Sequence, residues 1–170
     1  IGLIGSPIDK KHLPNIPVLF TNDNDFIKNK KRIDFDTIII SIGMNIKLKS
    51  KLYNRYKEEN FIFTNAIHPS SIIATEVKIG EGNIICQGVT IGYQTVINNN
   101  NWIASKVNID HHNLLGSNLL IGPGTCTSGS VSIEDNVMIG TGCFFEPNLH
   151  IEENKIIKSG TIVNGRILDS

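Results

Sequence analysis

Apolar residues recur at every sixth position from residue 67 to residue 163, and this repeat constrains the fold more than any other feature. Fifteen of the seventeen positions hold Ile, Leu or Val, and the exceptions are Thr127 and Phe145. An α-helix repeats about every 3.6 residues and a flat strand about every two, so neither produces a strict period of six. A hexapeptide period is typical of a solenoid of short parallel strands. We therefore predict a mainly β protein built on a parallel β-helix.

We call the apolar sixth positions the ladder positions. The residues between them are rich in Gly and Asn, as the corners of such a solenoid require. These residue types tolerate tight turns and left-handed backbone. Three hexapeptides make one triangular coil, so residues 67–163 are expected to supply a little over five coils of a β-helix domain over residues 65–170. The ladder side chains would point inward and give a core that is built coil upon coil.

Residues 1–64 lack the repeat and are predicted to form a small, truncated α/β domain. Gly43 follows a continuous apolar run, and Asn45 then suits the N-cap of a helix with Leu48, Leu52 and Tyr56 on one face. In open α/β sheets ligands bind where strands end, so Gly43 and Asn45 are candidate substrate-binding residues. Strands are expected over residues 1–5, 17–20 and 37–42, and a short helix over 22–29.

Charge and composition exclude several classes of function. The chain is 40% hydrophobic and 19% charged, which fits a globular protein. Its net charge of zero divides into +4 over residues 1–64 and −4 over 65–170, and no nucleic-acid partner is expected. No apolar run approaches the roughly 20 residues of a membrane span, and no signal peptide is visible.

Three cysteines, Cys86, Cys126 and Cys143, form neither a paired framework nor a metal-spaced cluster. Unpaired thiols are typical of a reducing cytoplasm, which is the location we expect. The chain does not begin with Met, so we expect a fragment or a processed form. The cysteines are interpreted as structural thiols, because no base partner for a nucleophile is evident.

Three stretches together identify a family. They are IHPSSII (67–73), NIDHHNLLGSNLLIGPGT (108–125) and SGSVSIEDNVMIGTG (128–142). They resemble the hexapeptide-repeat acetyltransferases that modify bacterial surface sugars, namely the sugar-nucleotide N-acetyltransferases and the related sialic acid O-acetyltransferases. The resemblance implies a left-handed β-helix, a homotrimer with active sites between protomers, acetyl-CoA as co-substrate and a sugar-nucleotide substrate. It implies no metal.

The resemblance also implies roles for individual residues. A sugar amine or hydroxyl attacks the thioester of acetyl-CoA, and a base removes its proton. Histidine suits this task because its ordinary pKa of about 6.5 leaves it largely neutral at pH 7. By match to the family's motif the base is His111, with Asp110 or His112 beside it. Gly129 matches the glycine whose amide faces the acetyl carbonyl, and Gly140, Gly142 and Gly160 match those that line the coenzyme groove.

The sequence departs from the family's pattern at three positions. Where the family has an acid directly after the catalytic histidine, this chain has His112. An asparagine seven residues before the histidine is replaced by Ala104, and a second histidine nine residues after it by Leu120. These departures leave two alternatives to an N-acetyltransferase, namely a sugar O-acetyltransferase and a catalytically weakened trimeric scaffold.

Other candidate sites are weaker. Asp110, His111 and His112 are adjacent in sequence, and adjacent side chains rarely chelate one metal ion. His68 is interpreted as a junction residue at the start of the solenoid. Trp102 is equally compatible with stacking on a substrate ring and with packing between protomers.

Overall fold

The computed structural model describes residues 3–4, 18–20, 22–32 and 35–165. Contacts between residues divide the chain into two compact units, Ile1–Asp36 and Thr37–Ser170. The predicted domain boundary after residue 64 lies within the second unit, which also contains the solenoid. Among the described residues, no helix is both long and apolar enough to cross a bilayer.

The first unit has a parallel pair of strands, β1 (Leu3–Ile4) and β2 (Val18–Phe20), as the apolar runs predict. The predicted short helix is confirmed as α2 (Asp23–Asn29), and the 3-10 helix η1 (Lys30–Arg32) follows it. Residues 1–2, 5 and 17 of the predicted strands lie outside the described residues.

The second unit begins with an extended segment and helix α3 (Ile46–Glu58). The predicted strand over 37–42 is wrong in extent, since only Ile38 forms a parallel bridge, with Phe63. The predicted N-cap is confirmed, because Asn45 Oδ1 accepts from the Leu48 N–H at 3.0 Å. The predicted helix face is wrong at Leu48, which is exposed, while Lys49 is buried in its place.

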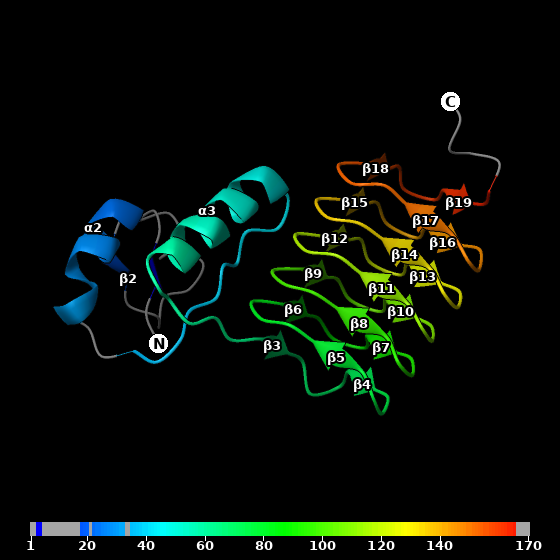
Figure 1. Cartoon of the computed structure of the whole chain (residues 1–170), viewed down its shortest axis with the longest axis horizontal. Coiled ribbons are helices and arrows are strands. Elements are labelled where there is room, and N and C mark those ends of the chain that lie inside the picture. The colour runs from blue at the N-terminus through cyan, green and yellow to red at the C-terminus, as the bar shows by residue number, and fades with distance from the viewer. Residues whose placement is uncertain (1–2, 5–17, 21, 33–34, 166–170) are drawn as a thin grey trace. The chain divides into compact units, whose positions relative to one another are not determined.

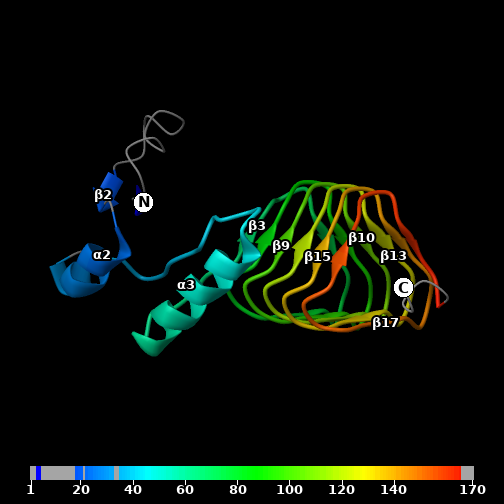
Figure 2. The ribbon, with the colours of Figure 1, turned by 90° about the horizontal axis from the view of Figure 1, so that it is seen from above.

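Residues 66–163 form the predicted left-handed parallel β-helix, whose coils are stacked in Figure 1 and seen nearly end-on in Figure 2. Each coil contributes one two-residue strand to each of three parallel sheets. Strand partners are separated by one full coil throughout, for example Ile109 with Ile91 and Thr127. The structural repeat is therefore one coil, which consists of three hexapeptides of the sequence.

The sheets are named after their first strands. The β3 sheet contains β3 (Ala66–Ile67), β6 (Ile84–Ile85), β9 (Trp102–Ile103), β12 (Leu120–Ile121), β15 (Met138–Ile139) and β18 (Ile156–Ile157). The β4 sheet contains β4 (Ile72–Ile73), β7 (Thr90–Ile91), β10 (Asn108–Ile109), β13 (Cys126–Thr127), β16 (Phe144–Phe145) and β19 (Ile162–Val163). The β5 sheet contains β5 (Lys78–Ile79), β8 (Val96–Ile97), β11 (Leu114–Leu115), β14 (Ser132–Ile133) and β17 (His150–Ile151).

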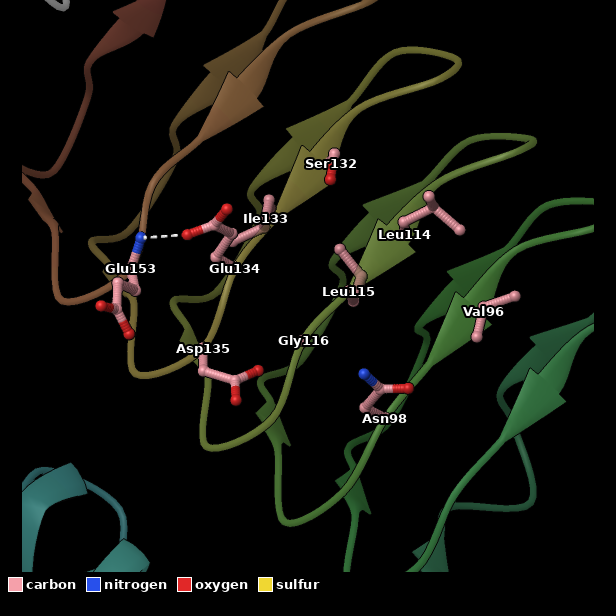
Figure 3. A pocket seen from close by; sticks show the side chains of 10 residues that line it. All are labelled: Val96, Asn98, Leu114, Leu115, Gly116, Ser132, Ile133, Glu134, Asp135 and Glu153. Atoms are coloured by element: carbon pink, nitrogen blue, oxygen red, sulfur yellow. Dashed lines mark hydrogen bonds between the residues drawn. The ribbon is translucent and has the colours of Figure 1, made fainter.

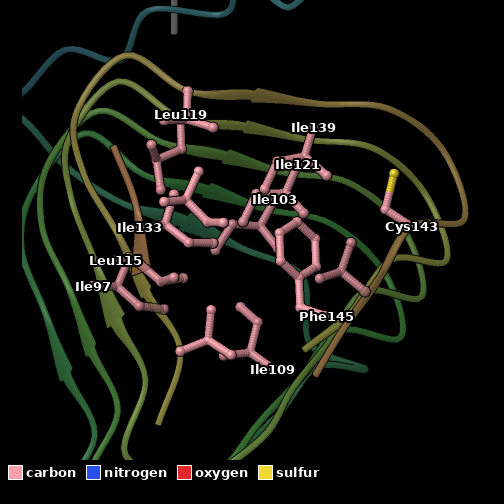
Figure 4. Packing of buried hydrophobic residues seen from close by; sticks show 14 of the residues in the cluster. Ile97, Ile103, Ile109, Leu115, Leu119, Ile121, Ile133, Ile139, Cys143 and Phe145 are labelled. Carbon is pink, nitrogen blue, oxygen red and sulfur yellow. The ribbon is translucent and has the colours of Figure 1, made fainter. Parts of the chain in front are cut away.

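The second residue of each strand from β6 to β17, and of β19, is buried in the solenoid, and these side chains form most of the core that Figure 4 shows in part. Ile103, Ile109 and Ile121 are 0% exposed, so the predicted inward ladder is confirmed. The two exceptions to the ladder are neighbours, because Thr127 pairs with Phe145 in the β4 sheet. The small Thr127 leaves room for the large Phe145, which is also 0% exposed.

Corner glycines serve two different purposes. Gly142 has φ +65°, a left-handed conformation that glycine adopts without strain. Gly122 has no such conformation, but a Cβ there would lie 2.5 Å from the carbonyl carbon of Gly140 in the next coil. The predicted turn role is therefore confirmed for Gly142, while Gly122 is needed because two coils approach closely.

Candidate active site

The predicted catalytic residues lie on one edge of the solenoid, which we call the histidine edge. It consists of the loops that follow the β4-sheet strands, so its members recur once per coil. The third loop carries Asp110, His111 and His112, the loop one coil before it carries Tyr93, and the loop one coil after it carries Gly129. The loops of this edge are residues 74–77, 92–95, 110–113, 128–131 and 146–149.

His111 and His112 are both exposed and contact each other. Their Nδ1 atoms are 2.9 Å apart, and the rings are nearly perpendicular with centroids 5.0 Å apart. Asp110 does not reach either ring, because its Oδ1 accepts from the backbone N–H of His111 at 2.8 Å. His112, and not Asp110, is therefore the ring partner of His111.

Gly129 lies directly against the His111 ring. A Cβ at residue 129 would come within 2.8 Å of His111 Nε2 and closer still to Cε1, so any side chain there would displace the ring. The Gly129 carbonyl accepts from the Asn148 N–H at 3.1 Å, whereas the Gly129 N–H has no acceptor among the described residues. An unpaired buried N–H beside a histidine is suited to bind an oxygen that gains negative charge.

The predicted coenzyme glycines lie on a second edge, formed by the loops that precede the β4-sheet strands. We call it the glycine edge. Gly142 and Gly160 have positive φ values, and a Cβ at either would meet nothing within 4 Å. Gly140 is packed more tightly, against the backbone of Ser159. The β4 sheet separates this edge from His111, so one chain does not bring these glycines and the histidine together.

The predicted substrate-binding residues lie next to the β3 sheet, which does not border the histidine edge. A Cβ at Gly43 would be 3.7 Å from the Trp102 ring, so the chain packs on that ring. The Asn45 side chain is engaged as the N-cap of α3. Neither residue is brought near His111 within one chain.

A buried lysine anchors α3 to the third edge, formed by the loops that follow the β5-sheet strands. Lys49 is 1% exposed, and its Nζ donates to the Asn100 carbonyl at 2.5 Å. Burial lowers the pKa of Lys49 from 10.5 to about 8. The Asn100 Oδ1 atom nearby is buried without a hydrogen-bond partner among the described residues.

Glu81 makes a second contact between α3 and this edge. Its Oε1 accepts from the Tyr53 hydroxyl at 2.7 Å and pairs with Lys57 Nζ at 2.7 Å. Burial alone would raise the pKa of Glu81, but the hydrogen bonds from Lys57 and Tyr53 lower it. Burial raises the pKa of Tyr53, and the hydrogen bond to Glu81 raises it further. Residues 37–64 are therefore fixed to the solenoid by polar contacts.

The other sequence candidates have structural explanations. Cys143 is buried, and its thiol donates to the Lys158 carbonyl at 3.1 Å. Burial raises the pKa of the Cys86 thiol, and a hydrogen bond with Trp102, which lowers that pKa, offsets only part of the rise. A raised pKa makes a thiol a poorer nucleophile at neutral pH. The described residues contain no group of three or more side chains arranged to hold a metal ion.

Two departures from the family's pattern are buried positions. Ala104 is 8% exposed on the glycine edge, and Leu120 is 9% exposed in the β3 sheet between Trp102 and Met138.

Sequence reasoning missed Tyr93, whose ring lies edge-on to His112 at a centroid distance of 5.9 Å. A step of one coil back from His111 leads to Tyr93, so the coil period is the signal that finds it.

The site on one chain is an open edge. Two hollows on the described surface have volumes of about 460 and 530 Å³, and neither includes His111. The first, shown in Figure 3, lies over the β5 sheet and is bordered by the acidic Glu134, Asp135 and Glu153. The second surrounds His68 and Cys86 at the first coils.

Several solved structures with the same fold contain coenzyme A or acetyl coenzyme A. PerB from Caulobacter crescentus, in complex with CoA and GDP-perosamine, matches with a TM-score of 0.81 and 27% identity over 88% of this chain and 71% of that chain. A histidine-to-asparagine variant of perosamine N-acetyltransferase from the same organism matches with a TM-score of 0.83 and 26% identity, over 89% and 71%. The chain has the fold of the hexapeptide-repeat sugar acetyltransferases.

The acetyltransferase domain of PglB from Neisseria gonorrhoeae, in complex with acetyl coenzyme A, shares this fold with a TM-score of 0.80. Its identity is 19%, over 95% of this chain and 74% of that domain. No family model and no curated protein sequence matches. The neighbours confirm the predicted fold, and those with 26–27% identity to this chain, which agree with the predicted acyltransferase class, were solved with CoA.

Proposed function

We propose that this acyltransferase transfers the acetyl group of acetyl-CoA to the amine of an amino-sugar nucleotide, with His111 as the general base. One observation carries the proposal, namely the His111 ring lying against Gly129, whose N–H is unpaired among the described residues. A proton acceptor and an oxygen-binding donor are thereby placed side by side, which is what acyl transfer from a thioester needs.

The transfer proceeds directly, without a covalent enzyme intermediate. The amine nitrogen bonds to the thioester carbon while His111 Nε2 removes an amine proton. The Gly129 N–H donates to the carbonyl oxygen as it becomes negative. The tetrahedral intermediate then collapses, the carbon–sulfur bond breaks, and the leaving CoA sulfur takes the proton from His111.

An amine is preferred over a hydroxyl acceptor because the neighbours with 26–27% identity were solved with GDP-perosamine. Two of them are described as perosamine N-acetyltransferases. The sugar-nucleotide substrate is assigned to residues 1–64, with contacts to Gly43 and Asn45. Sugar nucleotides of this kind are precursors of bacterial surface polysaccharides, and we propose that the protein acts in that synthesis in the cytoplasm.

We propose a homotrimer, because one chain leaves the site incomplete. His111 lies on one edge, while Gly140, Gly142 and Gly160 lie on another, so a groove between two protomers would bring the two sets together. The outward side of the β3 sheet offers a surface for such packing. Its outward row is apolar over five consecutive coils and consists of Ile84, Trp102, Leu120, Met138 and Ile156. Leu120 is buried within one chain, and Ile156 is the exposed member of these five, at 68%.

The test is acetyl transfer by the purified protein. The protein is incubated with acetyl-CoA and a panel of GDP- and UDP-linked amino sugars, and products are identified by mass spectrometry. We predict acetylation of at least one amine-bearing acceptor, and loss of that product in His111→Asn but not in the surface variant His150→Asn. Acetylation of hydroxyl groups only would favour the O-acetyltransferase, and no transfer to any acceptor would favour the scaffold.

A further inference from the structure

His112 stands where the ring of His111 needs a hydrogen-bond partner. At an Nδ1–Nδ1 distance of 2.9 Å, one nitrogen must carry the proton and the other must accept it. Asp110 does not supply this acceptor, because its carboxylate accepts from the His111 backbone. The partner of His111 in this chain is therefore a neutral heterocycle in place of a carboxylate.

The preceding coil holds His112 in place. The His112 N–H donates to the Tyr93 carbonyl at 2.9 Å, and the two rings meet edge to face. Gln94 Nε2 donates to the Tyr93 hydroxyl at 3.2 Å and to Glu76 Oε2 at 3.0 Å. The ring that contacts His112 is thus itself tied to the first coil.

The backbone conformation of His112 adds a constraint. Its φ is +57°, in the left-handed region that Asn, Asp and His adopt more readily than most residues. In this conformation the His112 ring lies against the ring of the residue before it. On a regular strand, neighbouring side chains point to opposite faces.

We propose that His112 is a positioning residue whose Nδ1 accepts the Nδ1–H of His111 and thereby fixes the His111 tautomer with a bare Nε2. This inference rests on the proposed function. When Nε2 takes the amine proton, the His111 ring becomes positive, and its Nδ1–H donates more strongly to His112. The proton then leaves from Nε2 to the CoA sulfur, and both rings return to their starting tautomers.

A neutral partner has a consequence that a carboxylate would not have. A nearby negative charge favours the protonated form of an imidazole, and a neutral acceptor does so much less. The His112 ring therefore orients His111 without placing a negative charge against it. The other titratable side chains on this edge are Glu76, Tyr93, Asp110 and Glu146, and all are retained in the variants below.

The test compares three substitutions at residue 112 in the full chain. His112→Asn keeps a neutral acceptor, His112→Asp supplies a carboxylate, and His112→Ala has no acceptor. Asn and Asp both tolerate the left-handed backbone at this position. We expect kcat to fall on the order of 100-fold in His112→Ala with little change in KM, since a misplaced base costs about that much. We expect a smaller loss in His112→Asn.

The pH profile separates positioning from mere packing. In His112→Asp the acidic limb of the kcat profile should move upward by about one pH unit, while in His112→Asn it should stay near that of wild type. The matched control is His150→Ala, which removes an exposed histidine paired with Glu134 at 3.1 Å on the β5 sheet. This control should leave both kcat and the profile unchanged.

A second measurement does not depend on the variants folding or on activity. Nitrogen-15 NMR of the wild-type imidazoles should show His111 protonated at Nδ1 and bare at Nε2. His111 protonated at Nε2, or kcat unchanged in folded His112→Ala, would overturn the inference. If wild type transfers no acetyl group, the proposed function fails instead, so the two failures are distinguishable.

Discussion

Gly129 and His111 are one coil apart along the chain and lie in contact on adjacent coils, with no space between them for a side chain. The strand pairing of β10 with β13 sets this relationship, because it places residue 129 directly over residue 111. The position of the proposed base therefore depends on a glycine in the next coil.

Gly129→Ala is expected to reduce kcat on the order of 100-fold, because the added methyl group would push the His111 ring out of position. Steady-state kinetics of CoA release measures the effect. Gly165→Ala is the matched control, since a Cβ there meets nothing within 4 Å. Equal activity of the two variants would contradict the assigned contact.

Lys49 is expected to make the folded state more stable as the pH rises. Burial lowers its pKa to about 8 in the folded state, so between about pH 8 and 10.5 the unfolded chain binds more protons. The cost of the buried charge is full below pH 8 and is relieved over this window by up to about 3 kcal/mol. Tyr53 opposes the trend above about pH 10, because its raised pKa favours the unfolded state there.

Urea unfolding from about pH 8 to about pH 9.5 tests this prediction. Wild type should gain stability relative to Lys49→Met across that range. The exposed Lys47→Met should follow wild type. A constant difference between wild type and Lys49→Met would show that Lys49 does not titrate in this window.

Asn45→Ala is expected to lower the free energy of unfolding by about 1 kcal/mol, because the Leu48 N–H loses its acceptor. Asn45→Asp keeps a capping oxygen and should retain most of the stability. If Asn45 also contacts the sugar nucleotide, KM should rise in Asn45→Asp at unchanged stability. Chemical unfolding and steady-state kinetics of the same preparations separate the two roles.

Ile156→Glu is expected to dissociate the proposed trimer. Ile156 is 68% exposed in one chain, so the change costs little in folding but buries a charge if the β3 sheet packs against a second copy. Light scattering should give three times 18.7 kDa for wild type and a lower mass for the variant. Leu114→Glu, at a 53% exposed position of the β5 sheet, should remain trimeric.

The solenoid could be predicted from the sequence because each ladder residue makes the same inward contact in every coil. The pairing of Thr127 with Phe145 could be found in the same way, at one coil period. The extent of the strand at 37–42 could not, since only Ile38 finds a partner there. The apolar pattern of α3 also predicted the wrong buried face at Leu48. Lys49 is buried there instead, and its hydrogen bond to Asn100 is not visible in a pattern of apolar residues.

The candidate site was predictable in part. His111 and Gly129 were identified by motif, and the coil period explains why they meet. The contact of His112 with His111 was not predictable from strand alternation, which sends neighbours to opposite faces. It depends on the left-handed conformation at residue 112, and the sequence carries little signal for that beyond a corner position.

The most direct test of His111 as the base is the rate of CoA release with acetyl-CoA and the best amino-sugar nucleotide, compared between wild type and His111→Asn. Circular dichroism and light scattering establish that both proteins have the same fold and assembly. We predict a loss of kcat of about 100-fold or more in the variant. Equal rates for the two proteins would contradict His111 as the base.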